Sequence, residues 1–296
     1  MGSFSILNNI SGINAQNQLN INNVNLARTL LRMSSGKRVN TGADDAAGLQ
    51  IADSLRANVK ALDQAVRNAN DGISVAQIAD GALNEIGNLL TRAVTLAEEA
   101  ATGTVDSAAR TALNDEFTKI KNEIGRIAQN TDFNGKTLIE NSATGLNGSL
   151  NVFVGDAQLN TSIAVTFGSI TVASGSATVF STLGSSPTTA DITSSSLAGS
   201  DGLAAKTALG SIKSALSVVS SMRGSIGAGI NRLQSSVAVM MAQSQNTQAA
   251  ESTIRDANMA EEVANLTKYQ ILAQSGISSL AQANQNAQIV LGLIRT

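Results

Sequence analysis

The chain has 296 residues, a formal net charge of −2, no His, no Cys and one Pro. Without His and Cys it lacks the commonest general base, the commonest zinc ligand and thiol chemistry, and its charge balance does not suit nucleic-acid binding. Aromatic residues make up only 2% of the chain, whereas apolar residues make up 43%. This composition favours narrow helix–helix seams over a thick globular core.

The N-terminal stretch, MGSFSILNNISGINAQNQLN, lacks the basic start and the continuous apolar run of a cleaved signal peptide. No run of about 18 apolar residues occurs anywhere, so we expect no transmembrane helix. Apolar residues recur through the N-terminal segment with polar interruptions at Asn17 and Asn20. We expect them to form a packing stripe that consists of Ile6, Ile10, Ile13, Val24, Ala27 and Leu31.

The stretch MSSGKRVNTGADDAAGLQIADSLRA, residues 33–57, contains Gly-Lys-Arg and two adjacent carboxylates. A phosphate-binding P-loop needs a Gly five residues before the Gly-Lys pair and a Ser or Thr after it, but Leu31 and Arg38 occupy those positions. Thr41 instead suits a helix N-cap, with Asp44 three residues later as the second member of a capping box. We therefore interpret this stretch as a joint that leads into a helix.

The strongest periodicity follows this joint and predicts a helix over residues 44–101. Apolar residues are spaced alternately three and four apart, and only Asp80 and Gly87 interrupt them. Such a helix would be roughly 85 Å long and implies an elongated molecule. Thr102 and Gly103 suit a helix stop. The seam consists of Ala52, Leu55, Val59, Leu62, Val66, Ala69, Ile73, Ala76, Asp80, Leu83, Gly87, Leu90, Val94 and Ala97.

Three further seams are predicted, over residues 113–127, 212–240 and 263–294. The second of these carries a charged residue, Arg223, among aliphatic ones. The C-terminal seam includes Asn284, and a polar residue at such a position can set register at some cost in stability. Its predicted packing residues are Ile277, Leu280, Asn284, Ala287, Leu291 and Ile294.

The middle of the chain reads differently, because it is rich in Ser, Thr and Gly and shows β-branched alternation. We expect a hairpin turn at Asn134-Gly135 and strands near 136–140, 150–154, 162–167 and 169–173. Residues 174–202 read as a loop; its Ser/Thr-rich part either accepts O-linked sugars or is a flexible polar tip. The fold class is therefore mainly α: an elongated coiled-coil bundle of N- and C-terminal helices with a small β-hairpin-rich insertion.

We expect the two chain ends to be loose in a lone molecule, because one seam between two helices buries only one face of each. Ordering roughly 70 residues costs on the order of 100 kcal/mol, whereas each buried aliphatic side chain returns roughly 1.5–3 kcal/mol. We expect the ends to order fully when several copies pack together.

Three blocks of sequence resemble bacterial flagellin. LRMSSGKRVNTGADDAAGLQIADSLRA resembles its N-terminal block, and RGSIGAGINRLQSS and SGISSLAQANQNAQIVLGLIR resemble its C-terminal blocks. The similarity covers roughly residues 1–140 and 205–296. It implies a structural subunit that self-assembles helically into the flagellar filament for motility, with no enzymatic activity and no cofactor. The alternatives are a hook–filament junction protein and a coiled-coil scaffold or adhesin that does not polymerise.

The resemblance also implies how the chain is divided into domains. Residues 1–43 and 255–296 would be the inner-tube terminal helices, and 44–254 the outer coiled-coil domain with a variable β-rich insertion at about 132–202. Its partners would be identical subunits, the flagellar export apparatus, an export chaperone on 255–296, and hook-junction and cap proteins, with neither nucleic acid nor membrane. The protein would be secreted to the extracellular flagellum.

The family is also sensed by an animal innate receptor through the outer helices. Arg92, Leu96 and Glu116 match the recognised surface in part, whereas Val94 and Thr95 stand where recognised members carry Arg and Glu. The resemblance therefore predicts weak or absent receptor signalling.

Overall fold

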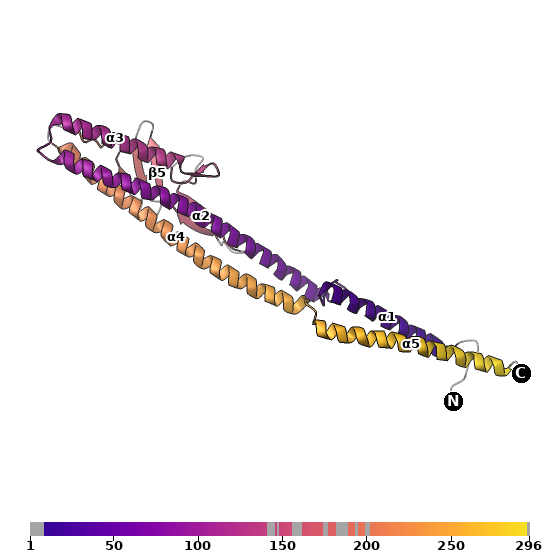
Figure 1. Cartoon of the computed structure of the whole chain (residues 1–296). Helices are drawn as coiled ribbons and strands as arrows, with labels where there is room; N and C mark the ends of the chain where they lie inside the picture. Colours follow the sequence, from indigo (N-terminus) through magenta and orange to yellow (C-terminus); the bar gives the residue numbers. More distant parts are fainter. Residues whose placement is uncertain are drawn as a thin grey trace. The chain divides into compact units, whose positions relative to one another are not determined.

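The computed structural model describes residues 9–140, 146, 148–155, 162–173, 177–181, 189–192, 195–198 and 202–294. Over these residues the chain is mainly helical, with short antiparallel strands in its middle, which confirms the predicted fold class at that level (Figure 1). The helices are α1 (Ile10–Ser35), α2 (Ala46–Ala101), α3 (Ser107–Asn130), α4 (Leu203–Arg255) and α5 (Met259–Ile294). No helix in this described part is long and apolar enough to cross a bilayer.

The chain divides into two compact units. The terminal unit consists of Met1–Val59 and Gln245–Thr296, and the central unit consists of Lys60–Ser244. Helices α2 and α4 contribute residues to both units, whereas α1 and α5 belong to the terminal unit and α3 and the strands to the central one.

In the terminal unit, α1 lies antiparallel to α5 (Figure 1). The Asn9 side chain caps α1 by accepting from the Gly12 N–H at 3.0 Å, and its Nδ2 donates to the Ala283 carbonyl oxygen at 3.2 Å. A Cβ added to Gly276 would lie 3.3 Å from Leu19 Cδ1, so the two helices approach closely at this point. The absence of a side chain at Gly276 therefore permits this close approach.

The long second helix ends as predicted, but its N-cap differs from the prediction. Asp45 is the cap, because its Oδ1 accepts from the Gly48 N–H at 2.8 Å and the helix begins at Ala46. The prediction that Thr41 caps the helix is therefore wrong. Asp44 does reach back to Thr41 as a capping box requires, but the two residues close a separate turn before the helix.

The predicted seams of the central unit form its core. Along α2, Leu62, Ala69, Ala76, Leu83, Leu90 and Ala97 are buried. They join Phe117 and Ile124 of α3 and Ile212, Ile226 and Leu233 of α4 in one apolar cluster. The heptad interpretation of these stretches is confirmed by this shared burial.

The turn between α2 and α3 is fixed by polar contacts. Arg110 is buried and its Nε donates to the Ala100 carbonyl oxygen at 3.0 Å, which satisfies the C-terminal end of α2. Asp106 caps α3 by accepting from the Ala109 N–H at 2.8 Å.

Where the structure describes the middle of the chain, it forms three small antiparallel sheets. Asn134 and Gly135 both have positive φ, which is the geometry of the predicted two-residue hairpin turn. The strands are β1 (Asp132–Phe133) with β2 (Lys136–Thr137), β3 (Ser149–Phe153) with β4 (Ser162–Thr166), and β5 (Ser169–Ala173) with β6 (Ala177–Ser181) and β7 (Thr189–Asp191). Val152, Val165, Phe167 and Ile170 belong to the helical core, so the sheets pack on the helices.

The strand predictions for β3, β4 and β5 are confirmed to within about one residue at each end. The strand predicted near 136–140 is wrong beyond Thr137, where β2 ends. Among the described strands, β1 was not predicted, and β6 and β7 lie in the stretch expected to be a loop. Their Ser- and Thr-rich sequence gives little hydrophobic alternation, and what holds β6 is pairing with β5 from Ser169↔Ser181 to Ala173↔Ala177. The Ser/Thr-rich stretch that would accept sugars lies largely outside the described residues.

Candidate assembly surface and helix joint

Each helix of the terminal pair exposes large apolar side chains. Ile13 is 50% exposed on α1 and Ile277 is 54% exposed on α5. Isolated exposed aliphatic residues are ordinary, but a run of them along two packed helices is typical of an interaction surface. The exposed apolar face consists of Ile10, Ile13, Ile21, Val24 and Leu31 on α1 and Val263, Ile271 and Ile277 on α5.

The side of α1 that faces α5 carries smaller and more polar residues. Gly12, Asn22 and Thr29 are buried there, and Leu19 and Leu26 are half-buried. Small residues let helix backbones approach closely, so this contact leaves the branched side chains of α1 outside it. Leu19 lies on the contact itself, since its Cδ1 is the atom that a Cβ at Gly276 would meet.

The predicted packing residues can be located on this arrangement. Ile10, Ile13, Val24, Ala27, Leu31, Ile277 and Asn284 are exposed, and Leu280 is half-buried. Ile6 lies outside the described residues. The backbones of Ala287, Leu291 and Ile294 belong to α5, but their side chains lie outside the description.

Beyond this face, the break between α1 and α2 is tied to the break between α4 and α5. Lys37 and Asp256 form an antiparallel β-bridge. The Arg38 N–H donates to the Arg255 carbonyl oxygen at 2.7 Å, and the Ala257 N–H donates to the Gly36 carbonyl oxygen at 3.0 Å. Gly36 has φ +69°, the left-handed conformation that ends a helix. Two helix breaks far apart in sequence therefore form one joint.

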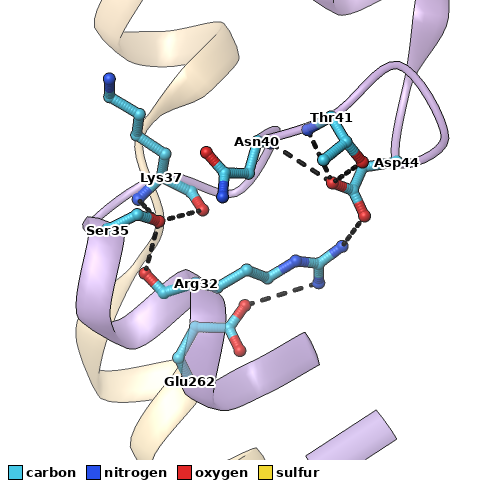
Figure 2. A network of polar contacts seen from close by, with 7 residues as sticks. All are labelled: Arg32, Ser35, Lys37, Asn40, Thr41, Asp44 and Glu262. Carbon is cyan, nitrogen blue, oxygen red and sulfur yellow. Dashed lines mark hydrogen bonds and ion pairs between the residues drawn. The ribbon is translucent and has the colours of Figure 1, made fainter. Parts of the chain in front are cut away.

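An ionic network lies beside this bridge (Figure 2). Arg32 of α1 places Nη1 3.6 Å from Glu262 Oε1 of α5 and Nη2 3.9 Å from Asp44 Oδ1 of the connection. One guanidinium thus faces carboxylates from two other segments. In Figure 2 the Lys37 ammonium points away from this network, while its backbone N–H donates to Ser35 Oγ.

The carboxylate of Asp44 is held by its own turn. Its Oδ2 accepts from the Thr41 N–H at 3.0 Å, from the Thr41 hydroxyl at 2.9 Å and from the Asn40 N–H at 3.3 Å. The hydrogen bonds from Thr41 are the main cause that lowers the pKa of Asp44, with smaller contributions from Asn40 and the charge of Arg32. The ionised form of Asp44 therefore stabilises the turn.

Glu262 is the most enclosed member of the network, at 7% exposure. Its Oε2 and the Nε of Arg32 are buried without a hydrogen-bond partner. Neither residue was predicted from the sequence, since neither interrupts an apolar repeat. A signal was nonetheless present, because an acidic residue in the first turn of a helix interacts favourably with the helix dipole.

These contacts decide the interpretation of the stretch that carries Gly36, Lys37 and Arg38. Its backbone pairs with the connection between α4 and α5, and its acidic residues complete a turn and cap a helix. The stretch is therefore a structural joint, as the sequence indicated.

The residues that match the receptor-recognition pattern lie on α2 and α3. Arg92 and Glu116 are exposed, and Arg92 donates from Nε and Nη2 to Glu116 Oε1 at 3.0 and 2.7 Å. Leu96 is only 1% exposed because it packs in the helical core. Leu96 therefore does not belong to the surface expected for all three, because it packs in the helical core although it lies off the predicted seam.

Comparison with known proteins agrees with this architecture. The protein family described as "Bacterial flagellin N-terminal helical region" matches residues 6–144, and the family described as "Bacterial flagellin C-terminal helical region" matches residues 209–294. Flagellin of Halalkalibacterium halodurans is 36% identical over 290 residues, which cover 98% of this chain and 99% of that protein. The flagellar filament 31.3 kDa core protein of Treponema maltophilum is 34% identical over 296 residues, with the same coverage of each.

Among solved structures, a crystal structure of Bacillus cereus flagellin matches with a TM-score of 0.46 at 25% identity, over 62% of this chain and 94% of that one. The sequence matches take in both terminal helices, the joint and the seams of the central unit. On that basis the chain belongs to the bacterial flagellin family.

Proposed function

We propose that this chain is the repeating structural subunit of a bacterial flagellar filament and that copies pack through the exposed apolar face of α1 and α5. The observation that carries the proposal is the run of exposed branched residues on a helix pair whose internal contact uses small and polar ones. Flagellin relatives of matching length, including a filament core protein, support the same role.

The energetics support packing between copies. Burying one exposed aliphatic side chain contributes roughly 1.5–3 kcal/mol, so a face of this extent is a strong driving force for association. When another copy covers the exposed apolar face, α1 and α5 become more firmly ordered. The free energy gained by burial then offsets the conformational entropy that the helices lose. The homopolymer is therefore the most stable state of the terminal unit.

The proposal assigns separate roles along the sequence. Residues 1–43 and 255–296 form the inner tube, and residues 44–254 form the outer coiled-coil domain with its insertion at about 132–202. The joint between α1 and α2 lies at the first of these boundaries, and the break between α4 and α5 lies at the second. Both helix breaks thus coincide with the proposed change of layer.

Flagellin membership also supports the proposed partners. The chain would leave the cell unfolded through the flagellar export apparatus, with an export chaperone on 255–296, and would meet hook-junction and cap proteins at the ends of an extracellular filament. Recognition by the innate receptor would be weak, since Val94 and Thr95 depart from the recognised pattern and Leu96 is enclosed.

Seeded polymerisation of purified protein tests the function. The wild-type chain is expected to form long filaments that sediment, which a junction protein or a non-polymerising scaffold would not do. The I13Q/I277Q variant should stay in the supernatant with unchanged helical circular dichroism. The matched control is L203Q, which alters an exposed apolar residue of the central unit and should polymerise normally. Normal polymerisation of I13Q/I277Q would contradict the assigned surface.

A further inference from the structure

Helices α2 and α4 run antiparallel within the central unit, and contacts at several points show which of their residues lie opposite one another. Ser244 Oγ donates to Asp63 Oδ1 at 3.2 Å near one end. A Cβ added to Gly72 would lie 3.5 Å from Leu233 Cδ1. Lys213 Nζ lies 3.5 Å from Glu98 Oε1 toward the other end.

The apolar part of this seam does not by itself choose that alignment. Both helices repeat aliphatic residues at intervals of three and four, so a shift by one heptad again places aliphatic residues opposite one another. Specificity between such alignments needs a feature that is favourable in one and unfavourable in the others.

Two charged residues occupy seam positions, and they meet. Arg223 of α4 donates from Nε to Asp80 Oδ1 of α2 at 2.9 Å and from Nη2 to Asp80 Oδ2 at 3.4 Å. Its Nη1 donates to Asn84 Oδ1 at 2.9 Å. The hydrogen bonds from Arg223 thus satisfy both oxygens of Asp80 in a bidentate geometry.

We propose that the Asp80–Arg223 pair fixes the heptad register of α2 against α4. A shift of one heptad in one direction would place Asp80 opposite Ile230 and Arg223 opposite Gly87. A shift in the other direction would place Asp80 opposite Leu216 and Arg223 opposite Ile73. Each shifted alignment separates the two charges and sets each against a residue that cannot pair with it.

The pair acts on specificity more than on stability. Both side chains are partly exposed, at 37% for Asp80 and 41% for Arg223, and ion pairs in such settings add little to the free energy of unfolding. A charge left facing an aliphatic neighbour in a shifted alignment loses its partner and part of its hydration, so it disfavours that alignment. Asp80 and Arg223, which interrupt the two apolar repeats, thus specify the alignment of α2 against α4.

Disulfide formation can report the register, because the natural chain has no Cys. The pair D63C/S244C reports the native alignment, and D63C/V237C and N70C/S244C report shifts of one heptad in either direction. A heptad moves a helix by about 10.5 Å, beyond the roughly 4.4–6.8 Å between Cα atoms that a disulfide spans. Each pair is placed in the natural background and in D80L/R223L, and the chains are refolded before oxidation.

In the natural background we expect cross-linking at D63C/S244C alone. In D80L/R223L the yield at the two shifted pairs should rise roughly tenfold relative to the native pair, since the seam then repeats without interruption there. Cross-linking of D80L/R223L at the native pair alone would overturn the proposal.

A charge reversal gives an independent control if the leucine variant loses its helical circular dichroism. D80R places two guanidinium groups together and should raise the shifted cross-links. D80R/R223D restores an opposite pair and should return cross-linking to D63C/S244C. Equal patterns in D80R and D80R/R223D would also overturn the proposal.

Discussion

The guanidinium Nη2 of Arg38 donates to the carbonyl oxygen of Ile254 at 2.7 Å. A side chain from the connection between α1 and α2 thus satisfies a carbonyl in the last turn of α4, which otherwise has no partner within its own helix. The backbone N–H of the same residue donates to the Arg255 carbonyl oxygen. Arg38 therefore holds the two helix breaks together through both its backbone and its side chain.

Replacing Arg38 with Ala should loosen this joint. The Ile254 carbonyl loses a charged donor, a contact worth about 1.5–3 kcal/mol. Hydrogen exchange at the amides of Asp256 and Ala257 should accelerate, while that of the α3 core stays unchanged. The matched control is K37A, whose ammonium lies outside the network in Figure 2 and which should leave this exchange as it is. Equal acceleration in both variants would contradict the role of Arg38.

Replacing Asp45 with Ala should destabilise the start of α2. The free energy of unfolding in urea should fall by roughly 0.5–2 kcal/mol, because the Gly48 N–H loses its acceptor. D45S keeps a capping oxygen and should retain most of the stability. If D45A and D45S were equally destabilised, the loss would not be one of capping.

Features of this fold that follow from local sequence are predictable, whereas features that depend on contacts between distant segments are not. The heptad repeat predicts the length of α2 and the buried face around Leu83 and Leu90, because one periodic signal controls both. Choosing Asp45 over Thr41 as the cap depends on where the backbone of the joint turns. That turn is held by Arg38 and by residues near position 255, a contact that no local pattern contains.

The candidate assembly surface was likewise predicted only in part. The sequence identifies apolar stripes at both chain ends, and the predicted residues Ile13, Val24 and Ile277 are exposed in the structure. Which side of α1 meets α5 could not be predicted, because small residues such as Gly12 compete with larger ones for that contact. Leu96 was placed on a surface by family resemblance, whereas its burial follows from the neighbouring α3 and α4.

Stability should depend on pH through Asp44. Its folded pKa lies below that of the unfolded chain, about 3.9, so the unfolded state binds more protons in between. The stabilisation is therefore complete above about pH 5 and is lost as pH falls through the folded pKa. Urea unfolding of D44N at pH 3 and pH 6 should show a smaller difference than the wild-type chain.

Removal of one donor tests the cause of this dependence. T41V keeps the Asp44 carboxylate but removes the hydroxyl that donates to it at 2.9 Å. Its difference in stability between pH 3 and pH 6 should fall between those of the wild-type chain and D44N. A dependence as large as that of the wild-type chain would contradict the contribution of the hydroxyl.

Two glycines in the long helices should respond to Ala in opposite directions. A Cβ at Gly72 would lie 2.5 Å from Val152 Cγ2, so G72A should destabilise the central unit by roughly 1–3 kcal/mol. No atom lies within 4 Å of a Cβ at Gly224, so G224A should stabilise α4 by roughly 0.5–1 kcal/mol. Thermal unfolding of both variants measures the difference, and a change of the same sign in both would contradict this packing of β3 on α2.

Maleimide labelling of single introduced thiols, in monomers and in filaments, tests the central claim most directly. V24C, in a chain otherwise free of Cys, is mixed in trace amounts with wild-type protein and polymerised, with L203C as the exposed control. We expect V24C to react at least about tenfold more slowly in filaments than in monomers, because burial between copies removes its access to solvent. L203C should react equally in both states. Filaments in which V24C reacts as fast as in the monomer would show that this face is not where the copies meet.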